Sequence, residues 1–385
     1  MDPRAALRRL AGRDRPPPLR VDAPVDLLQV LREGPAALVP GRSGGESLSI
    51  AFVVPQFRRG AGGHATIANL VRGLEARGHD CSLWVLDDEG RHAGESSEQV
   101  GALFRSFFGS VRASVVKGFD GWRGADVAVA TGWQTVAAVL RRPSVGARAY
   151  LVQDHEPEFY GTSAERMWAE WTYRQGLHCI AASPWLAGVL RDRYGASASS
   201  FDLAVDHERY RETDAARRDD LVVFYARAVT ARRAVPLGLL ALEELRRRRP
   251  GVEIALFGES RPVTSRFAYT DLGVLDAARL ADVYRSATAG LVLSLTNPSL
   301  IPLEMMACGL PCVDVAGDAT RATFGADGPV ELVAPDPLAL ADAIERLFDS
   351  AQLRAERSRA GAAWVAPRTW AAAAEQVEAG LRAAR

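Results

Sequence analysis

The sequence predicts an α/β protein made of two similar halves, each built on a parallel β-sheet. Short apolar runs that suit buried parallel strands alternate with longer segments of helical periodicity. This alternation begins at Leu48 and restarts at Leu221. The 385 residues are enough for two domains of ordinary size, each with its own core.

Composition excludes several classes of function. Hydrophobic residues make up 48% and charged residues 24% of the chain, as in a globular protein. Lys+Arg and Asp+Glu both number 47, so no overall field favours nucleic acid. No apolar run approaches the roughly 20 residues of a membrane span, and the start lacks the apolar core of a signal peptide. The four scattered cysteines form no disulfide framework or zinc pattern, so we expect a cytoplasmic protein.

Residues 1–47 form an arginine- and proline-rich arm. A short amphipathic segment with Leu7 and Leu10 carries four arginines that could contact anionic lipid at the inner face of the membrane. These arginines are Arg4, Arg8, Arg9 and Arg13. The favoured alternative is a loose arm that packs on its own domain.

A glycine-rich loop follows the first strong strand, Leu48–Val54. Gly62 and Gly63 allow a ligand to approach the backbone, and the N-terminus of the next helix favours a phosphate. His64 could contact phosphate or acceptor, with a helix-capping role as an equal alternative. A glycine loop alone is weak support for a binding site.

Three titratable residues, Asp154, His155 and Glu156, follow the predicted strand Ala147–Val152. Carboxyl ends of parallel strands converge on one crevice, but alternating side-chain directions mean that not all three can face it. Asp154 is the first choice for a general base or an acid that orients the acceptor. A purely structural role is the alternative. No partner motif accompanies the trio, so we expect no metal site.

Two arginines follow the first strand of the second half, Leu221–Tyr225. Arg227 and Arg232 lie five residues apart on one loop, where their guanidinium groups can clamp a diphosphate. The polar stretch 195–220 before this strand is predicted to connect the two domains.

The segment Ser294–Pro311 organises the second half. The strand Gly290–Leu293 ends there, Asn297-Pro298 breaks the chain, and a short helix begins near Pro302. Glu304 thus lies beyond the carboxyl end of a strand, where it can accept hydrogen bonds from two sugar hydroxyls. The alternative is a solvated acid favoured by the helix dipole.

This segment resembles a known family. Pro-Leu-Glu-Met-Met-Ala-Cys-Gly-Leu-Pro is similar to the nucleotide-sugar signature of GT-B glycosyltransferases of family 4. The preceding Asn-Pro-Ser form resembles the bacterial rhamnosyltransferases of rhamnan-type surface glycan synthesis. Gly62-Gly63 followed by Arg77-Gly78-His79 resembles the opening of this family, and Arg227 with Arg232 resembles its Arg-x4-Lys clamp.

The resemblance, which covers residues 48–385, implies two Rossmann-like domains facing each other across a cleft. Residues 48–205 would form the acceptor domain and 206–366 the nucleotide-sugar domain. Residues 367–385 would form a helix that crosses back to the first domain, and the arm 1–47 has no counterpart.

The resemblance also implies a metal-independent, retaining glycosyltransferase without cofactor. It would move a sugar from a nucleoside-diphosphate donor, with dTDP-L-rhamnose favoured, to a glycan, lipid-linked or small-molecule acceptor. The implied catalytic residues are Asp154, Arg227 and Arg232. The implied donor-binding residues are Gly62, Gly63, His64, Tyr269, Leu272, Asn297, Ser299, Leu300 and Glu304.

Two departures from the family pattern keep alternatives open. The first of two acids spaced seven residues apart falls at Thr296, and a frequent histidine falls at Gln153. The alternatives are another GT-B enzyme, such as a nucleotide-sugar epimerase or phosphorylase, and a non-catalytic nucleotide-sugar-binding paralogue.

Overall fold

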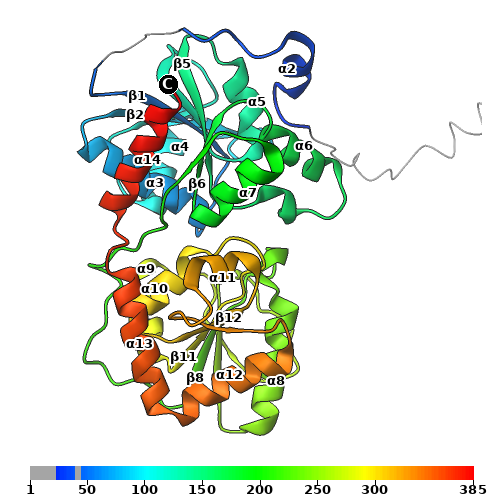
Figure 1. Cartoon of the computed structure of the whole chain (residues 1–385), viewed down its shortest axis with the longest axis vertical. Coiled ribbons are helices and arrows are strands. Elements are labelled where there is room, and N and C mark those ends of the chain that lie inside the picture. The colour runs from blue at the N-terminus through cyan, green and yellow to red at the C-terminus, as the bar shows by residue number, and fades with distance from the viewer. Residues whose placement is uncertain (1–22, 40–44) are drawn as a thin grey trace, which may run out of the picture.

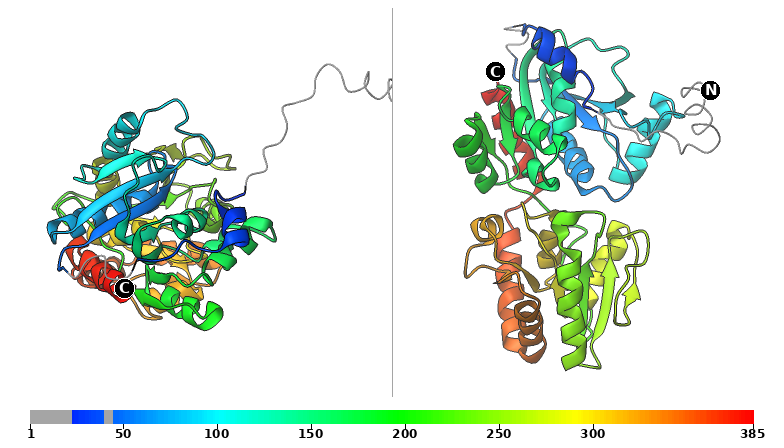
Figure 2. Two further views of the ribbon diagram at one scale, coloured as in Figure 1. Left: turned by 90° about the horizontal axis from the view of Figure 1, so that it is seen from above. Right: turned by 90° about the vertical axis from the view of Figure 1, so that its right-hand side faces the viewer.

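The computed structural model describes residues 23–39 and 45–385, which fold into two α/β domains stacked along the long axis of the molecule (Figure 1). The views from above and from the side show the same two halves (Figure 2). The four arginines of the arm lie outside the described residues. Within the described ranges, no helix is long and apolar enough to cross a membrane.

The first domain has a seven-stranded sheet of order β3-β2-β1-β4-β5-β6-β7, in which every neighbouring pair is parallel. The strands are β1 Ser49–Pro55, β2 Asp80–Leu86, β3 Ser114–Lys117, β4 Ala125–Ala130, β5 Val145–Val152, β6 His178–Ala181 and β7 Ala198–Ser200. The helices are α2 Leu27–Glu33, α3 Gly62–Ala76, α4 Ser97–Phe108, α5 Trp133–Arg141, α6 Ala164–Thr172 and α7 Pro184–Tyr194, with the 3-10 turn η1 Glu156–Phe159.

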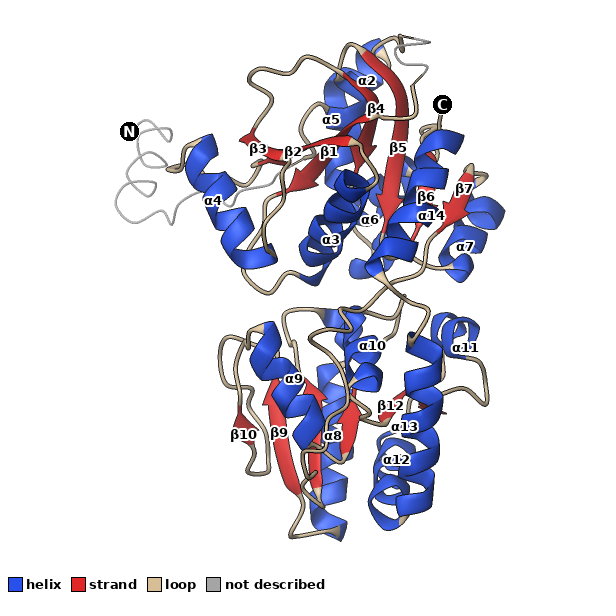
Figure 3. Cartoon of the chain, turned by 90° about the vertical axis from the view of Figure 1, so that its left-hand side faces the viewer, coloured by secondary structure: helices blue, strands red, loops and turns tan. Residues whose placement is uncertain are grey.

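Helices cover both faces of this sheet, which is why its central strands are apolar on both sides. Every residue of β4 is buried. Side chains of β1 with alternating direction enter two different cores: Phe52 packs with α3 and α4, and Val53 packs with α5 and α7. The sheet is therefore the middle layer of three (Figure 3).

The second domain has a six-stranded parallel sheet of order β10-β9-β8-β11-β12-β13. The strands are β8 Leu221–Tyr225, β9 Glu253–Phe257, β10 Thr270–Asp271, β11 Ala289–Leu291, β12 Cys312–Val315 and β13 Glu331–Val333. The helices are α8 Val235–Arg248, α9 Ala277–Ser286, α10 Leu300–Ala307, α11 Asp318–Phe324, α12 Pro337–Asp349 and α13 Ala351–Val365, with the 3-10 turn η2 Ala231–Arg233.

Both sheets reverse their strand order beside their first strand, between β1 and β4 and between β8 and β11. Ligands of open α/β sheets bind at such switch points, beyond the carboxyl ends of the strands. Loops from these two ends meet where the domains touch, because residues of the second domain donate hydrogen bonds to Asp154 of the first.

The last helix, α14 Trp370–Ala383, packs on α3, β6 and β7 of the first domain. It contacts α3 where Gly73 leaves room for Ala374, and Arg77 forms an ion pair with Glu378. The chain crosses between the domains a second time just before this helix (Figure 1).

The predicted α/β class is confirmed, and several features differ from the sequence-based expectation. Strand β7 lies inside the polar stretch that was predicted to be connection only. Its sequence, Ala-Ser-Ser, is half-buried at a sheet edge and carries no apolar signal. Strand β3 and helices α2, α4 and α11 were also not predicted.

Candidate functional site

Asp154, at the end of β5, joins the two domains. Its Oδ2 atom accepts hydrogen bonds from Arg232 Nε at 2.9 Å and Thr296 Oγ1 at 3.0 Å, both from the second domain. Its Oδ1 atom accepts from the backbone N–H groups of Asn297 at 3.0 Å and His155 at 2.9 Å. The side chain is buried. Sequence analysis named Asp154, Arg232 and Asn297 separately, and the structure brings them into direct contact.

The Asn297 side chain anchors the same loop in the first domain. Its Nδ2 atom donates to the carbonyl oxygens of Gln153 at 3.1 Å and Ala182 at 3.2 Å. Its Oδ1 atom accepts from Ser183 Oγ at 2.9 Å. Every polar atom of this amide thus serves the contact between domains. Ser183 also caps helix α7, because its Oγ accepts from the Leu186 N–H.

The neighbours of Asp154 point away from the second domain, which confirms that the three titratable side chains cannot all face one crevice. His155 Nε2 lies 2.7 Å from the Tyr194 hydroxyl. Glu156 accepts from the Trp133 N–H at 2.6 Å and from the Tyr150 hydroxyl at 2.8 Å. Burial raises the pKa of Glu156 to about 7, because the charged form is poorly solvated there.

The two predicted clamp arginines differ in their surroundings. Arg232 stacks over the Phe159 ring, with the guanidinium carbon 3.8 Å from the ring centroid. Arg227 is half-buried and donates to the Gly258 carbonyl at 3.4 Å. No carboxylate of a described residue forms an ion pair with Arg227, so its charge is available to an anion.

Arg58, in the loop after β1, adds positive charge opposite Arg227. Burial lowers the pKa of Arg58, and the nearby charges of Arg227 and Arg91 lower it further. Arginines from the two domains therefore face a common region. Sequence analysis did not name Arg58 as a site residue, because only the fold brings it near Arg227.

The glycine loop of the first domain lies beside the Asp154 loop. Gln153 Nε2 donates to the Gly63 carbonyl at 3.2 Å, and a Cβ atom at Gly63 would lie 3.4 Å from Gln153. Helix α3 begins at Gly62 without a side-chain cap, so its first N–H groups remain unsatisfied by any described side chain.

His64 is held by its own domain. Its Nε2 atom lies 3.0 Å from the Pro55 carbonyl, and its ring stacks on Phe108. Burial lowers the pKa of His64, so the neutral ring donates to this carbonyl. His64 caps no N–H group of the helix, because α3 has no side-chain cap, so the predicted capping role is wrong. Ligand contact by His64 stays a prediction.

Glu304, on α10, is enclosed by two tyrosines. The Tyr284 hydroxyl donates to Oε2 at 3.4 Å, and the Tyr210 hydroxyl also bonds this carboxylate. Burial of the carboxyl group raises the pKa of Glu304 to about 8, because the charged form is poorly solvated there. The residue as a whole is half-buried, so a solvated acid and a ribose ligand both stay predictions for Glu304.

The remaining predicted donor residues lie on α10 and beside β10. Ser299 is the N-cap position of α10, and its buried Oγ finds no hydrogen-bond partner among the described residues. Leu300 begins that helix. Beside β10, Tyr269 donates to the Val263 carbonyl at 2.7 Å, and the Leu272 N–H bonds the Leu256 carbonyl. Among residues 23–39 and 45–385, no group of histidine, cysteine or acidic residues is arranged to hold a metal.

A cavity of about 160 Å³ lies beside Asn297 where the domains meet. The first domain contributes Ser183, Pro184 and Trp185, and the second contributes Pro298, Thr323 and Trp364, among others. The cavity shares Asn297 with the Asp154 contacts, so it lies next to them along the domain boundary.

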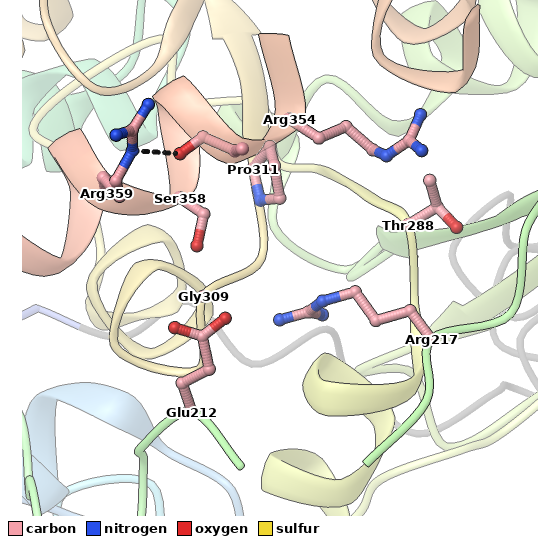
Figure 4. A pocket seen from close by; sticks show the side chains of 9 residues that line it. Glu212, Arg217, Thr288, Gly309, Pro311, Arg354, Ser358 and Arg359 are labelled. Carbon is pink, nitrogen blue, oxygen red and sulfur yellow. Dashed lines mark hydrogen bonds between the residues drawn. The ribbon is translucent and has the colours of Figure 1, made fainter. Parts of the chain in front are cut away.

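A second cavity, of about 260 Å³, lies within the second domain (Figure 4). Arg217 points into it and donates to four backbone carbonyls at the C-terminal ends of α9 and α10: Tyr284, Arg285, Ala287 and Cys308. A cation is favourable at both helix ends. Arg217 therefore has a structural role in this cavity, because it holds together α9 and α10, the helices that carry Tyr284 and Glu304.

Two parallel sheets whose switch points meet at a shared boundary define the GT-B fold of glycosyltransferases, and the chain has this fold. Solved structures with the same architecture support the assignment. The chain superimposes on Anabaena HepE in complex with UDP-glucose with a TM-score of 0.67 and 13% identity, covering 87% of this chain and 100% of that one. For sucrose-phosphate synthase from Thermosynechococcus elongatus, the TM-score is 0.63 at 15% identity, with 87% and 98% covered.

A family model and a sequence relative match parts of the chain. Residues 220–345 match the family model described as WsaF, C-terminal domain. The chain is 30% identical over 364 residues to the O-antigen biosynthesis protein RfbC of Myxococcus xanthus. This match covers 92% of the chain but 28% of the relative, so the chain spans little more than a quarter of that protein's length. The chain thus has the fold of GT-B glycosyltransferases and is similar in sequence to part of an O-antigen biosynthesis protein.

Proposed function

We propose that this chain is a metal-independent glycosyltransferase that moves a sugar from a nucleoside-diphosphate donor to a glycan, lipid-linked or small-molecule acceptor. The observation that supports it most is the pair Arg227 and Arg232 on one loop beyond β8. Arg232 is fixed by Asp154, and Arg227 is free of any ion pair with a described residue.

These arginines suit the chemistry of sugar transfer. Cleavage of the sugar–phosphate bond places negative charge on the leaving oxygen, and fixed positive donors stabilise that charge. The first N–H groups of α3 have no side-chain partner, and the Ser299 hydroxyl has no hydrogen-bond partner among the described residues. These groups add hydrogen-bond donors for the phosphates of the nucleotide-sugar. We propose retention of configuration, with the leaving phosphate taking the proton of the acceptor.

L-Rhamnose from dTDP-L-rhamnose is the favoured sugar, because the sequence of residues 297–309 resembles that of bacterial rhamnosyltransferases. UDP-sugars are the next candidates, because HepE, which has the same fold, was solved with UDP-glucose. The likeness to an O-antigen biosynthesis protein favours a glycan acceptor. All four cysteines are free and buried, which supports a reducing, cytoplasmic location.

A melting-temperature screen against dTDP-, UDP- and GDP-sugars tests the proposal. A donor at 100 times its Kd stabilises the folded chain by about 2.7 kcal/mol. We expect one nucleotide class to raise the Tm, and nucleoside diphosphate to be released only when an acceptor is present. No shift with any class would contradict the proposal.

Product analysis separates the alternatives. An epimerase would convert the donor without an acceptor, and a phosphorylase would need inorganic phosphate. A non-catalytic binder would be stabilised by the nucleotide-sugar without turnover. This alternative stays open because each carboxylate oxygen of Asp154 already accepts two hydrogen bonds.

A further inference from the structure

We propose that Asp154 is a positioning residue that orients Arg232 across the domain boundary, and that Thr296 and Asn297 hold Asp154 for this role. The diphosphate clamp would then be complete only when the domains close as in this structure. This inference rests on the proposed function and adds a requirement for closure to it.

Both carboxylate oxygens of Asp154 are already occupied by hydrogen bonds. A carboxylate offers about four lone-pair directions. Asp154 receives four hydrogen bonds, of which three come from the second domain and one from the adjacent His155 N–H. A base that collects the acceptor's proton needs a free lone pair, whereas a positioning residue needs the bonds that are present.

The two Nη atoms of Arg232 are not used by Asp154. Asp154 uses only the Nε–H, while the Phe159 ring covers one face of the guanidinium at 3.8 Å. A guanidinium has five N–H donors in a planar fork, so four of them lie on the two Nη atoms. These groups make no hydrogen bond to another described side chain, and the fork is held for bidentate contact with a diphosphate.

The contact with Asp154 accounts for an uncharged residue at position 296. The Thr296 hydroxyl donates to the same Oδ2 atom that Arg232 contacts, and Thr296 is buried. A glutamate here would place a second carboxylate against Asp154, and buried like charges repel strongly. The acid that the family pattern places at residue 296 is thus replaced by a carboxylate from the opposite domain.

The hydrogen bonds of Asp154 with Arg232, Thr296 and Asn297 depend on the arrangement of the domains, because the donors and the acceptor lie in different domains. Asn297 adds three further cross-domain bonds through its amide, to Gln153, Ala182 and Ser183. Opening of the domains breaks all of these together and releases Arg232 from Asp154. Arg232 would therefore be held for the donor only in the closed form.

Variants at Thr296 and Asp154 test the inference through turnover. Thr296→Val should lower kcat at least tenfold, and Thr296→Ser should lose less because it keeps the hydroxyl. Thr296→Glu should lose at least a hundredfold. The double variant Asp154→Asn with Thr296→Glu should recover at least tenfold over Thr296→Glu alone, because the introduced carboxylate can then orient Arg232 from its own domain. Thr162→Val, at an exposed threonine of the first domain, is the matched control and should not change kcat.

Amide hydrogen exchange supplies a readout that needs no donor. The Asn297 N–H bonds Asp154, so peptides covering residues 294–301 should exchange faster in Asp154→Asn and Thr296→Glu than in the wild-type chain. Failure of the proposed function would remove turnover but leave this measurement intact. Unchanged exchange in both variants would overturn the inference.

The pH dependence of kcat separates positioning from base catalysis. A positioning role leaves the shape of the profile the same in Thr296→Val as in the wild-type chain, with a lower maximum. A general base predicts instead that Asp154→Asn removes one limb and that the double variant recovers nothing. That second result would overturn the inference.

Discussion

Arg227 has a charge without an ion-pair partner among the described residues, which is unusual for a half-buried arginine at the end of a buried strand. Arg227→Ala should reduce kcat with the nucleotide-sugar donor by about a hundredfold or more, because a donor to the developing negative charge is lost. The fold should remain intact, since the hydrogen bond that Arg227 donates to Gly258 is long. Turnover and the Tm of the free chain measure the two effects.

Arg247→Ala is the control for this variant. Arg247 lies at the exposed C-terminal end of α8 and pairs with Glu244 of the same helix. Its removal should leave kcat close to that of the wild-type chain. Equal losses in the two variants, or wild-type turnover in Arg227→Ala, would contradict the clamp.

Glu304 makes stability depend on pH. Its folded pKa of about 8 lies above the unfolded value of 4.5, so the folded chain retains a proton that the unfolded chain releases. The free energy of unfolding should therefore fall as the pH rises from about 4.5 to 8. Glu304→Gln should reduce this slope, as measured by urea unfolding at several pH values.

Two other buried carboxyls, Glu156 and Asp314, have pKa values raised to about 7, so part of the slope should remain in Glu304→Gln. Glu356→Gln, at an exposed position of α13, serves as control and should keep the full slope. A slope that is the same in both variants would show that Glu304 is solvated in solution.

At the scale of elements, the docking of α14 depends on small residues. A Cβ atom at Gly73 of α3 would overlap Ala374, and one at Gly380 would lie 2.9 Å from Ile180. Gly73→Ala should lower the free energy of unfolding by about 1–2 kcal/mol, because overpacking outweighs the gain in helix propensity. Urea unfolding measures this change.

Gly188→Ala, in α7, is the same substitution without a neighbour within 4 Å. It should stabilise the chain by up to about 1 kcal/mol through helix propensity alone. The difference between the two variants isolates the contact of α3 with α14. A gain in both would show that α14 is not packed as described.

At the scale of the whole molecule, Glu378 ties the last helix to the first domain. Burial alone would raise its pKa, but hydrogen bonds from Arg77 and Arg382 lower it to about 2. Because this value is below the unfolded 4.5, the stabilisation is present above about pH 4.5 and is lost as the pH falls towards 2. Glu378→Gln should be less stable at pH 7 and lose less on acidification, as urea unfolding between pH 7 and 3 would report.

The fold and the position of the candidate site followed from the sequence wherever the signal was local. Apolar strands and the helix after Asn297-Pro298 depend on neighbouring residues, and the structure has them at the expected places. The contact of Asp154 with Thr296 joins residues 142 positions apart, and no local pattern encodes it. Arg58 and Ser183 were missed as site residues for the same reason. Strand β7 was missed because a half-buried edge strand need not be apolar.

The two chain crossings between the domains lie side by side, because the Val205 N–H bonds the Arg368 carbonyl at 3.1 Å. A single tether would permit twisting and sliding in many directions. Two adjacent connections act as a hinge and leave rotation about one axis as the least restricted motion between the domains. The two domains would then return to the same relative position each time they close, which is what a carboxylate that accepts from three donors of the opposite domain requires.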